Sequence, residues 1–249
     1  MSASDTWEGG QFWERFGLSA CPRFDGKTVL EVGCGEGNRC LEAALNGAEL
    51  VVGIDPLEAQ IATARSFLAT SRVARSSRVT FLKGTIETLA PKKFDVIISE
   101  DALEHVMNVS GLLAEIRNRL KPGGKFYLGF GPLYHAPEGD HGWLRAVLPG
   151  RNFFPWPWGH LLLKNYAFRE LSKLHGRAVA QTRDWPYLDL NQHTVAQYEE
   201  MFRNSGLRIA YIRKNHVKSL KARLFAMLGH LPILSKYCTI NMFVIFEFP

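Results

Sequence analysis

A glycine-rich turn between two apolar segments constrains this chain more than any other feature. Thr28–Val32 is a short apolar run typical of a buried strand, and glycines follow it at positions 33, 35 and 37. Because glycine tolerates conformations that side chains exclude, the turn predicts a loop whose backbone approaches a ligand closely. A second apolar run ends in Asp55, eighteen residues after the last glycine. In a strand–helix–strand unit an acid there faces the hydroxyls of a ribose, so the pattern predicts a nucleoside site.

The glycine spacing indicates which nucleoside the loop accepts. Dinucleotide-binding loops carry Gly-x-Gly-x-x-Gly, whereas this chain has Gly-x-Gly-x-Gly. A pyrophosphate favours the N-terminus of a helix, but Glu31 and Glu36 place negative charge around this loop. A ligand that carries an ammonium and a sulfonium suits these charges better.

At these residues the chain resembles the class I S-adenosylmethionine-dependent methyltransferases. The resemblance starts with the loop Glu31-Val32-Gly33-Cys34-Gly35-Glu36-Gly37 and Asp55, and it continues in order through residues 81–87, 94–100, 101–106 and 120–126. Several ordered elements over residues 26 to about 130 weigh more than one glycine loop, since a motif needs its context. The resemblance implies S-adenosyl-L-methionine as cofactor and S-adenosyl-L-homocysteine as product.

The resemblance also implies where the cofactor lies. Asp55 would bind the ribose, Leu57 would lie against adenine, and Thr85 stands at the adenine edge where the family often has Asp. The backbone of Ser99 and Glu100 would face the methionine ammonium. The residues expected to contact the cofactor are Glu31, Gly33, Cys34, Gly35, Gly37, Asp55, Pro56, Leu57, Thr85, Ile86, Glu87, Ser99 and Glu100.

Alternating strand and helix patterns predict an α/β fold with a Rossmann-like, seven-stranded methyltransferase sheet. We expect a single domain of four parts: an N-terminal helical segment (1–25), a cofactor-binding core (26–130), a cap insertion (131–193) and a C-terminal completion of the sheet (194–249). Strands are expected near 28–32, 50–54, 78–82, 94–99, 125–130, 207–212 and 239–248, and helices near 38–46, 57–70, 110–120 and 194–205, with a further helical stretch at 216–236.

The insertion 131–193 is irregular and dense in aromatic residues and proline. It is too long for an ordinary connection, and its aromatic content argues against disorder. We expect it to cover the C-terminal edge of the sheet, where ligands bind in such folds, and to form the acceptor pocket. Trp143, Trp156 and Trp158 either line that pocket or form only the insertion's own core.

Methyl transfer from a sulfonium is an in-line displacement, so the protein mainly aligns the reacting atoms. A hydroxyl acceptor also benefits from a general base. His105, in the Leu-Glu-His-Val segment after the fourth strand, is the first candidate, with a structural hydrogen bond as the alternative. Asp140 and His141 form a second candidate pair, which either acts as base and orienter or binds substrate hydroxyls, with ordinary loop capping as the alternative.

A divalent metal is a further alternative. Asp101, Glu104 and His105 have a spacing similar to the acid–acid–His set with which some relatives that methylate vicinal hydroxyls hold an ion. His135, His141 or His160 would complete it, and magnesium or manganese would suit mainly oxygen ligands. The same residues are common in members without a metal.

Charge and cysteine content bear on partners. The net charge is +6, and the excess is concentrated in the last fifty residues, either as a solvated surface or as a patch for an anionic partner. Residues 216–236 combine basic and apolar residues at helical spacing, which permits peripheral membrane contact or packing on the domain. No apolar run reaches the ~20 residues of a membrane span, and four cysteines without paired spacing indicate reduced thiols in a cytoplasmic protein.

These observations favour methyl transfer to a small-molecule acceptor, with a hydroxyl oxygen as the expected nucleophile. Two alternatives stay open: a nucleic-acid methyltransferase that uses the basic C-terminal region, and a non-catalytic cofactor-binding module. Enzymes that methylate base or amide nitrogens resemble one another in an Asn/Asp-Pro-Pro-Tyr/Phe run, where this chain has Ser99-Glu100-Asp101-Ala102. The absence of a recognised RNA-binding module also argues against nucleic acid.

Overall fold

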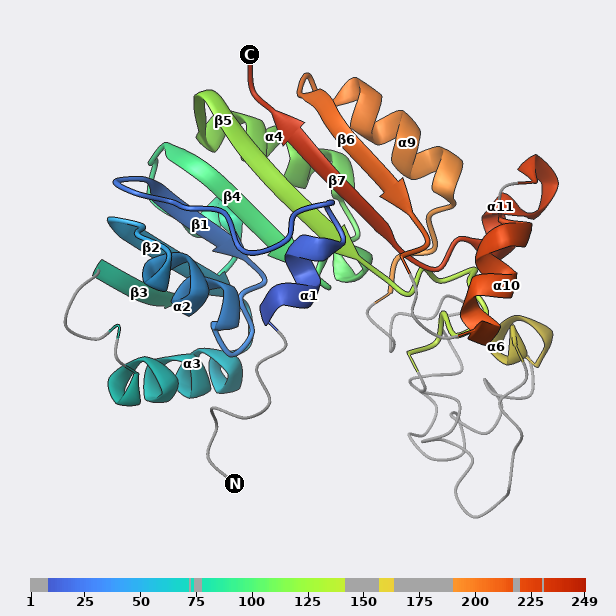
Figure 1. The fold of residues 1–249 in the computed structure, drawn as a ribbon, viewed down its shortest axis with the longest axis horizontal. Coiled ribbons are helices and arrows are strands. Elements are labelled where there is room, and N and C mark those ends of the chain that lie inside the picture. Colours follow the sequence, from blue (N-terminus) through green and yellow to red (C-terminus); the bar gives the residue numbers. More distant parts are fainter. Residues whose placement is uncertain are drawn as a thin grey trace.

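A computed structural model describes residues 9–71, 73, 78–141, 157–163, 190–216, 220–229 and 231–249. One seven-stranded sheet in the order β3-β2-β1-β4-β5-β7-β6 runs through the molecule (Figure 1). β7 is antiparallel to both of its neighbours, and the other pairs are parallel. This sheet confirms the Rossmann-like expectation. The strands are β1 (Thr28–Val32), β2 (Leu50–Asp55), β3 (Arg78–Lys83), β4 (Phe94–Glu100), β5 (Leu120–Phe130), β6 (Arg208–Lys214) and β7 (Met242–Glu247).

Helices cover both faces of the sheet. α1 (Gly9–Glu14), α2 (Asn38–Leu45) and α3 (Glu58–Thr70) lie on one face, and α4 (Val109–Arg119) and α9 (Val195–Asn204) lie on the other (Figure 1). Each face has its own apolar core: Phe12, Trp13 and Phe81 belong to the first, and Ile116 and Phe202 belong to the second. Shorter elements are η2 (Ile86–Thr88), η3 (Leu103–His105), α6 (Gly159–Leu162), α10 (Leu220–Leu228) and α11 (Pro232–Cys238).

The C-terminal part differs in detail from the expectation. The expected helical stretch at 216–236 contains α10 and the start of α11, which are separate because Gly229 follows α10 and Pro232 begins α11. β7 starts at Met242 instead of Thr239, because α11 continues to Cys238 and Asn241 accepts a hydrogen bond from the His216 backbone at 3.0 Å. No helix in the described parts of the chain has both the length and the hydropathy needed to cross a bilayer.

The strand order reverses between β1 and β4. β2 and β3 extend the sheet on one side of β1, while β4 and β5 extend it on the other. The β1–β4 pairing ends at Glu31 and Ile98, so the last residues of β4 run on past it. Ligands in open α/β sheets bind at such a switch point, outside the carboxyl ends of the strands. Much of the insertion, residues 142–156 and 164–189, lies outside the described residues, so its role as a cap stays a prediction.

Candidate functional site

The glycine loop between β1 and α2 has left-handed backbone at all three glycines, and two of them are required by packing. A Cβ on Gly33 would lie 2.5 Å from the Ala102 Cβ, and one on Gly37 would lie 2.5 Å from Phe81 Cζ. Gly35, with φ 48°, is different, because the nearest atom to its added Cβ is Gln60 Oε1 at 4.0 Å. Gly35 therefore presents an open backbone, which is what close approach of a ligand requires.

Asp55 holds this open glycine in place. Its buried carboxylate accepts the Gly35 N–H at 3.0 Å and the Leu57 N–H at 2.9 Å. An ionised carboxylate has about four lone-pair positions, so acceptor capacity remains for two hydroxyls. Pro56 is exposed beside it, and Leu57 is 60% exposed, which leaves an apolar side chain available to an aromatic base.

The Glu31 side chain lies deeper in the molecule than a residue in contact with the cofactor is expected to lie. It is buried, and it accepts the backbone N–H of Cys40 in the first turn of α2 at 2.9 Å. Burial, together with the charge of Glu100, raises the pKa of Glu31 to about 8. Burial also raises the pKa of the Cys34 and Cys40 thiols, which makes both unreactive at neutral pH.

Charged residues on α2 and just after α1 converge on the end of β4. Glu100 pairs with Arg39 of α2 at 2.7 Å and with Arg15, just after α1, at 3.7 Å. Arg39 also pairs with Glu42 at 2.6 Å, and its guanidinium lies 5.1 Å from the centre of the Phe12 ring. Beside Glu100, the Ser99 hydroxyl donates to the Val32 carbonyl at 3.0 Å. These contacts fix α1 at the switch point.

The segment after β3 carries the three residues expected at the adenine edge. Thr85 caps η2 together with Thr88, whose hydroxyl accepts the Thr85 N–H at 3.1 Å. Thr85 and Glu87 are exposed, whereas the Ile86 side chain is 1% exposed and belongs to the core. The expected contact between Ile86 and the cofactor therefore stays a prediction, and its buried side chain restricts it to backbone atoms.

The turn after β4 carries a buried acid. Glu104 Oε1 accepts the Gly131 N–H at 3.2 Å, while Oε2 has no hydrogen-bond partner among the described residues. Burial, together with the charge of Asp101, raises the pKa of Glu104 to about 8. Asp101 itself has left-handed backbone, and desolvation with the Glu100 charge raises its pKa to about 6. Glu104 is therefore mainly protonated at neutral pH.

Two histidines that are far apart in the sequence meet at this turn. The rings of His105 and His141 have centroids 5.6 Å apart in an edge-to-face arrangement. His141 Nε2 lies 2.9 Å from the Pro132 carbonyl, so Nε2 is the protonated nitrogen, and burial lowers the pKa of this ring. The structure thus adds a His105–His141 contact, and the pairing of Asp140 with His141 stays a prediction. His160 Nε2 lies 2.6 Å from the Tyr134 carbonyl, and burial lowers the pKa of this ring, which the charges of Asp140 and His141 also affect.

The expected metal-ligand set is changed by the structure. Ligand atoms of Glu104, His105 and His141 lie within 4.8 Å of one another, and among the described residues Asp101, His135 and His160 are outside this group. The unpartnered Oε2 of Glu104 fits a role as ligand. One carboxylate with two imidazoles suits manganese or zinc better than the magnesium that an oxygen-rich set would favour.

Two contributors were missed by sequence reasoning. Arg39 carried only a weak signal, a basic residue two positions after Gly37. Asn191, whose side-chain amide donates to the Leu103 and Val106 carbonyls beside Glu104 and His105, carried none, because the last residues of an irregular insertion gave no pattern. The contacts of both join segments far apart in the sequence, and pattern analysis does not detect such contacts.

Comparison with known proteins agrees with this geometry. Residues 23–130 match a family model described as a methyltransferase domain. Two similar proteins are both called ubiquinone biosynthesis O-methyltransferase. The one from Bradyrhizobium diazoefficiens is 30% identical over 53% of this chain and 60% of its own length. The one from Pseudomonas paraeruginosa is 39% identical over 46% of both chains, so this chain spans about half the length of such relatives.

Solved structures share the fold over nearly the whole chain. An S-adenosylmethionine dependent methyltransferase from Mesorhizobium loti has a TM-score of 0.57 at 21% identity, covering 95% of both chains. Magnesium protoporphyrin IX methyltransferase from Synechocystis, with bound SAH, has a TM-score of 0.54 at 17% identity, covering 91% of this chain and 75% of its own. The [4+2]-cyclase SpnF has a TM-score of 0.57 at 18% identity, covering 96% of this chain and 78% of its own. The cyclase illustrates that this fold alone does not determine the reaction.

Proposed function

We propose that this chain, whose residues 23–130 match a methyltransferase domain, is an S-adenosylmethionine-dependent methyltransferase that transfers a methyl group to a hydroxyl oxygen of a small-molecule acceptor. The observation that carries the proposal is the open backbone of Gly35, bonded to Asp55 at the switch point of the sheet. Relatives called O-methyltransferases support oxygen as the acceptor atom.

S-Adenosylmethionine supplies an activated methyl group when it is bound, and the chain supplies its placement. The free acceptor positions of Asp55 hold the ribose hydroxyls, and exposed Leu57 packs on the adenine. The ends of β1 and β4 then face the methionine part of the cofactor. The protein contributes alignment, which can supply ~7–11 kcal/mol of such a barrier.

The side chains gathered at the turn after β4 are proposed to remove the proton from the acceptor hydroxyl. His105 is exposed and next to His141, so it is the proposed general base for a hydroxyl. His141, which donates from Nε2 to Pro132, is the alternative base through Nδ1. Protonated Glu104 has a buried oxygen to spare for a hydrogen bond with the acceptor.

A matched pair of glycine variants tests the cofactor site. Gly35 (φ 48°) and Gly26 (φ 67°) both have left-handed backbone, and neither has an atom closer than 4 Å to an added Cβ. Gly35→Ala and Gly26→Ala therefore share backbone strain, but only Gly35 lies beside Asp55. We expect Gly35→Ala alone to lose SAH affinity in calorimetry. Equal affinity in the two variants would refute the proposed site.

The same three side chains support a second possibility, that a divalent cation takes part in methyl transfer. Glu104, His105 and His141 would hold the ion, and it would lower the pKa of an acceptor hydroxyl as a Lewis acid. The acid and the two imidazoles would then act as ligands rather than as acid and base. Metal addition distinguishes the two arrangements.

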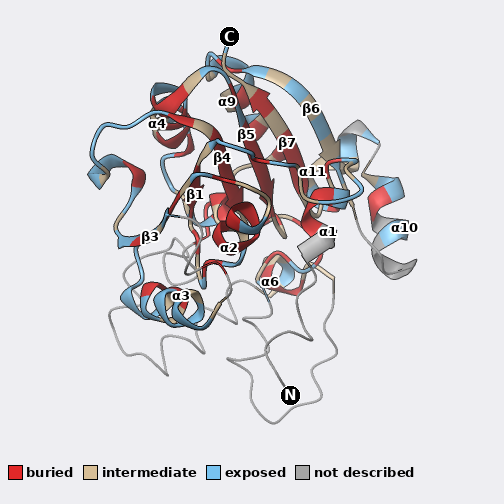
Figure 2. Ribbon diagram, turned by 60° about the vertical axis from the view of Figure 1, so that its left-hand side comes forward, coloured by how far each residue is buried: buried red, intermediate tan, exposed pale blue. Residues whose placement is uncertain are grey.

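We also propose that α10 and α11 rest on an anionic lipid surface. Leu224 and Met227 of α10 are 59% and 68% exposed, and Ile233 of α11 is 88% exposed. Figure 2 shows mainly exposed residues along the described part of α10. Residues 201–246 contain eight Lys or Arg and no Asp or Glu. Exposed apolar side chains on a basic background are typical of helices that lie in a membrane interface.

A further inference from the structure

A buried asparagine contacts the turn that carries Glu104 and His105. Asn191 is 5% exposed, and its backbone N–H donates to the Glu104 carbonyl at 2.7 Å. Its side-chain amide donates to the Leu103 carbonyl at 2.8 Å and to the Val106 carbonyl at 2.9 Å. One residue therefore satisfies three carbonyls of a four-residue turn that lies 85 or more residues away in the sequence.

The orientation of this amide is fixed from the other side. The Tyr198 hydroxyl donates to Asn191 Oδ1, and the His193 N–H reaches the same oxygen at 3.3 Å. Because the oxygen faces donors and the NH₂ group faces carbonyls, only one orientation satisfies every partner. Tyr198 is buried on α9 with its ring centre 4.8 Å from that of Phe130, so a helix of the core supports the amide.

The turn has few bonds that locate it on the sheet. Within it, the His105 N–H donates to the Ala102 carbonyl and the Val106 N–H to the Leu103 carbonyl, both at 3.0 Å. These bonds set its curvature. Its position depends on Asn191 and on the Glu104–Gly131 bond, together with the buried Leu103 side chain and the bond from the Asp101 N–H to the Gly129 carbonyl at 2.8 Å. Small displacements of a catalytic group are costly because the reacting atoms must be aligned.

We propose that Asn191, oriented by Tyr198, is the positioning residue that holds His105 and Glu104 toward the acceptor. The inference rests on the proposed function for its catalytic consequence, but the contacts that carry it do not. Asparagine suits the position because its side chain offers two donors and an acceptor on one short stem. Aspartate has nearly the same shape and would turn a carboxylate oxygen toward two carbonyls.

Three variants test this role. Asn191→Asp removes the two donors, and Tyr198→Phe removes the hydroxyl that orients the amide. Asn108→Ala is the matched control, because Asn108 accepts the Gly111 N–H at 2.9 Å and caps α4 just after the turn. The readouts are the NMR cross-peak between the His105 and His141 rings, SAH affinity, and kcat and KM with a hydroxylated aromatic acceptor that the wild type methylates.

We expect Asn191→Asp to abolish the cross-peak and to lower kcat without raising KM. Tyr198→Phe should weaken the cross-peak and lower kcat to a smaller extent. Asn108→Ala should preserve the cross-peak and kcat. SAH affinity should stay within about twofold throughout. An intact cross-peak in Asn191→Asp, or in Tyr198→Phe if the first variant does not fold, would overturn the proposal. A wild type that binds no SAH would instead refute the proposed function, and the cross-peak would still decide the role of Asn191.

Discussion

Asp55 and Gly35 are joined by a hydrogen bond of 3.0 Å across twenty residues of sequence, from the glycine N–H to the carboxylate. The same carboxylate accepts the Leu57 N–H, so it ties the glycine loop to the end of β2. Loop geometry and ribose recognition therefore depend on one side chain, and loss of its charge should affect both.

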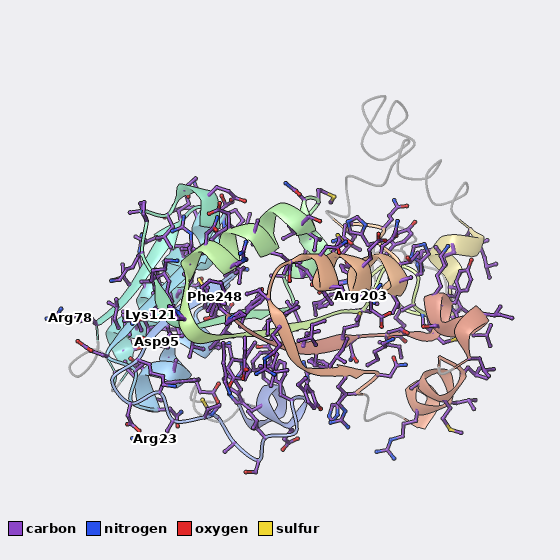
Figure 3. The ribbon with its side chains drawn as sticks, turned by 90° about the horizontal axis from the view of Figure 1, so that it is seen from above. Arg23, Arg78, Asp95, Lys121, Arg203 and Phe248 are labelled. Atoms are coloured by element: carbon purple, nitrogen blue, oxygen red, sulfur yellow. The ribbon has the colours of Figure 1, made fainter. Side chains whose placement is uncertain are left out.

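Asp55→Asn tests this dependence with minimal change of shape. We expect SAH affinity to fall by roughly tenfold or more, since hydrogen bonds to a charged group contribute about 1.5–3 kcal/mol. Asp95→Asn is the control: Asp95 also accepts backbone N–H, from Thr28, and pairs with Lys121 at 2.7 Å, but it lies at the start of β4 (Figure 3). Calorimetry that finds equal losses in both variants would contradict the assignment.

Removal of the proposed base should affect turnover and spare cofactor binding. General bases typically contribute 10²- to 10⁴-fold, so we expect His105→Gln to lower kcat by about that factor with SAH affinity unchanged. His216→Gln serves as the control, because His216 follows β6, its ring centroid lies 6.4 Å from that of Phe243 on β7, and it is outside the group of Glu104, His105 and His141. Methylation of a panel of hydroxylated aromatic compounds measures the effect, and full activity of His105→Gln would assign the role to His141.

Stability should depend on pH through Glu31 and Glu104. Burial raises both pKa values from 4.5 to about 8, so between these pH values the folded chain binds more protons than the unfolded chain. The free energy of unfolding should therefore fall as pH rises from about 5 to 8, by on the order of 1 kcal/mol or more. Urea unfolding at several pH values measures this, and Glu104→Gln should flatten the profile; an unchanged slope would show that Glu104 titrates alike in both states.

Metal dependence of turnover would show whether the side chains after β4 bind a cation or act as acid and base. If Glu104, His105 and His141 hold a cation, chelation should abolish turnover, and manganese or zinc should restore it. Glu104→Gln would then weaken the response to added metal. Turnover that is indifferent to chelator leaves His105 as a general base without an ion.

Lipid contact predicts a loss of vesicle binding when exposed apolar residues are replaced. Met227→Ser and Ile233→Ser together should lower co-sedimentation with phosphatidylglycerol vesicles several-fold, while Leu45→Ser, also at an exposed apolar residue, should not. Phosphatidylcholine vesicles should bind less than anionic ones. Equal binding by all variants would assign the patch to another partner, such as a protein.

Local pattern sufficed for the sheet but not for the site. The apolar runs that predicted β1, β2 and β4 are buried on both faces, so their hydrophobicity marked them clearly. Asp55 and the glycines were found because their spacing follows from one strand–helix–strand unit. The His105–His141 contact and the Asn191 bonds join remote segments, so no local spacing could reveal them. Arg39 was missed for the same reason, since its partner Glu100 is 61 residues away.

The place of β7 in the sheet has a consequence for synthesis on the ribosome. The five strands up to β5 are neighbours in space and can assemble once residue 130 has emerged. β6 cannot join them, because β7 lies between it and β5 and is made last. Until residues 242–247 leave the exit tunnel, β5 and β6 each present an unpaired edge, and such edges promote association between nascent chains. The strands up to β5 can thus assemble early during translation, whereas β6 must wait for β7.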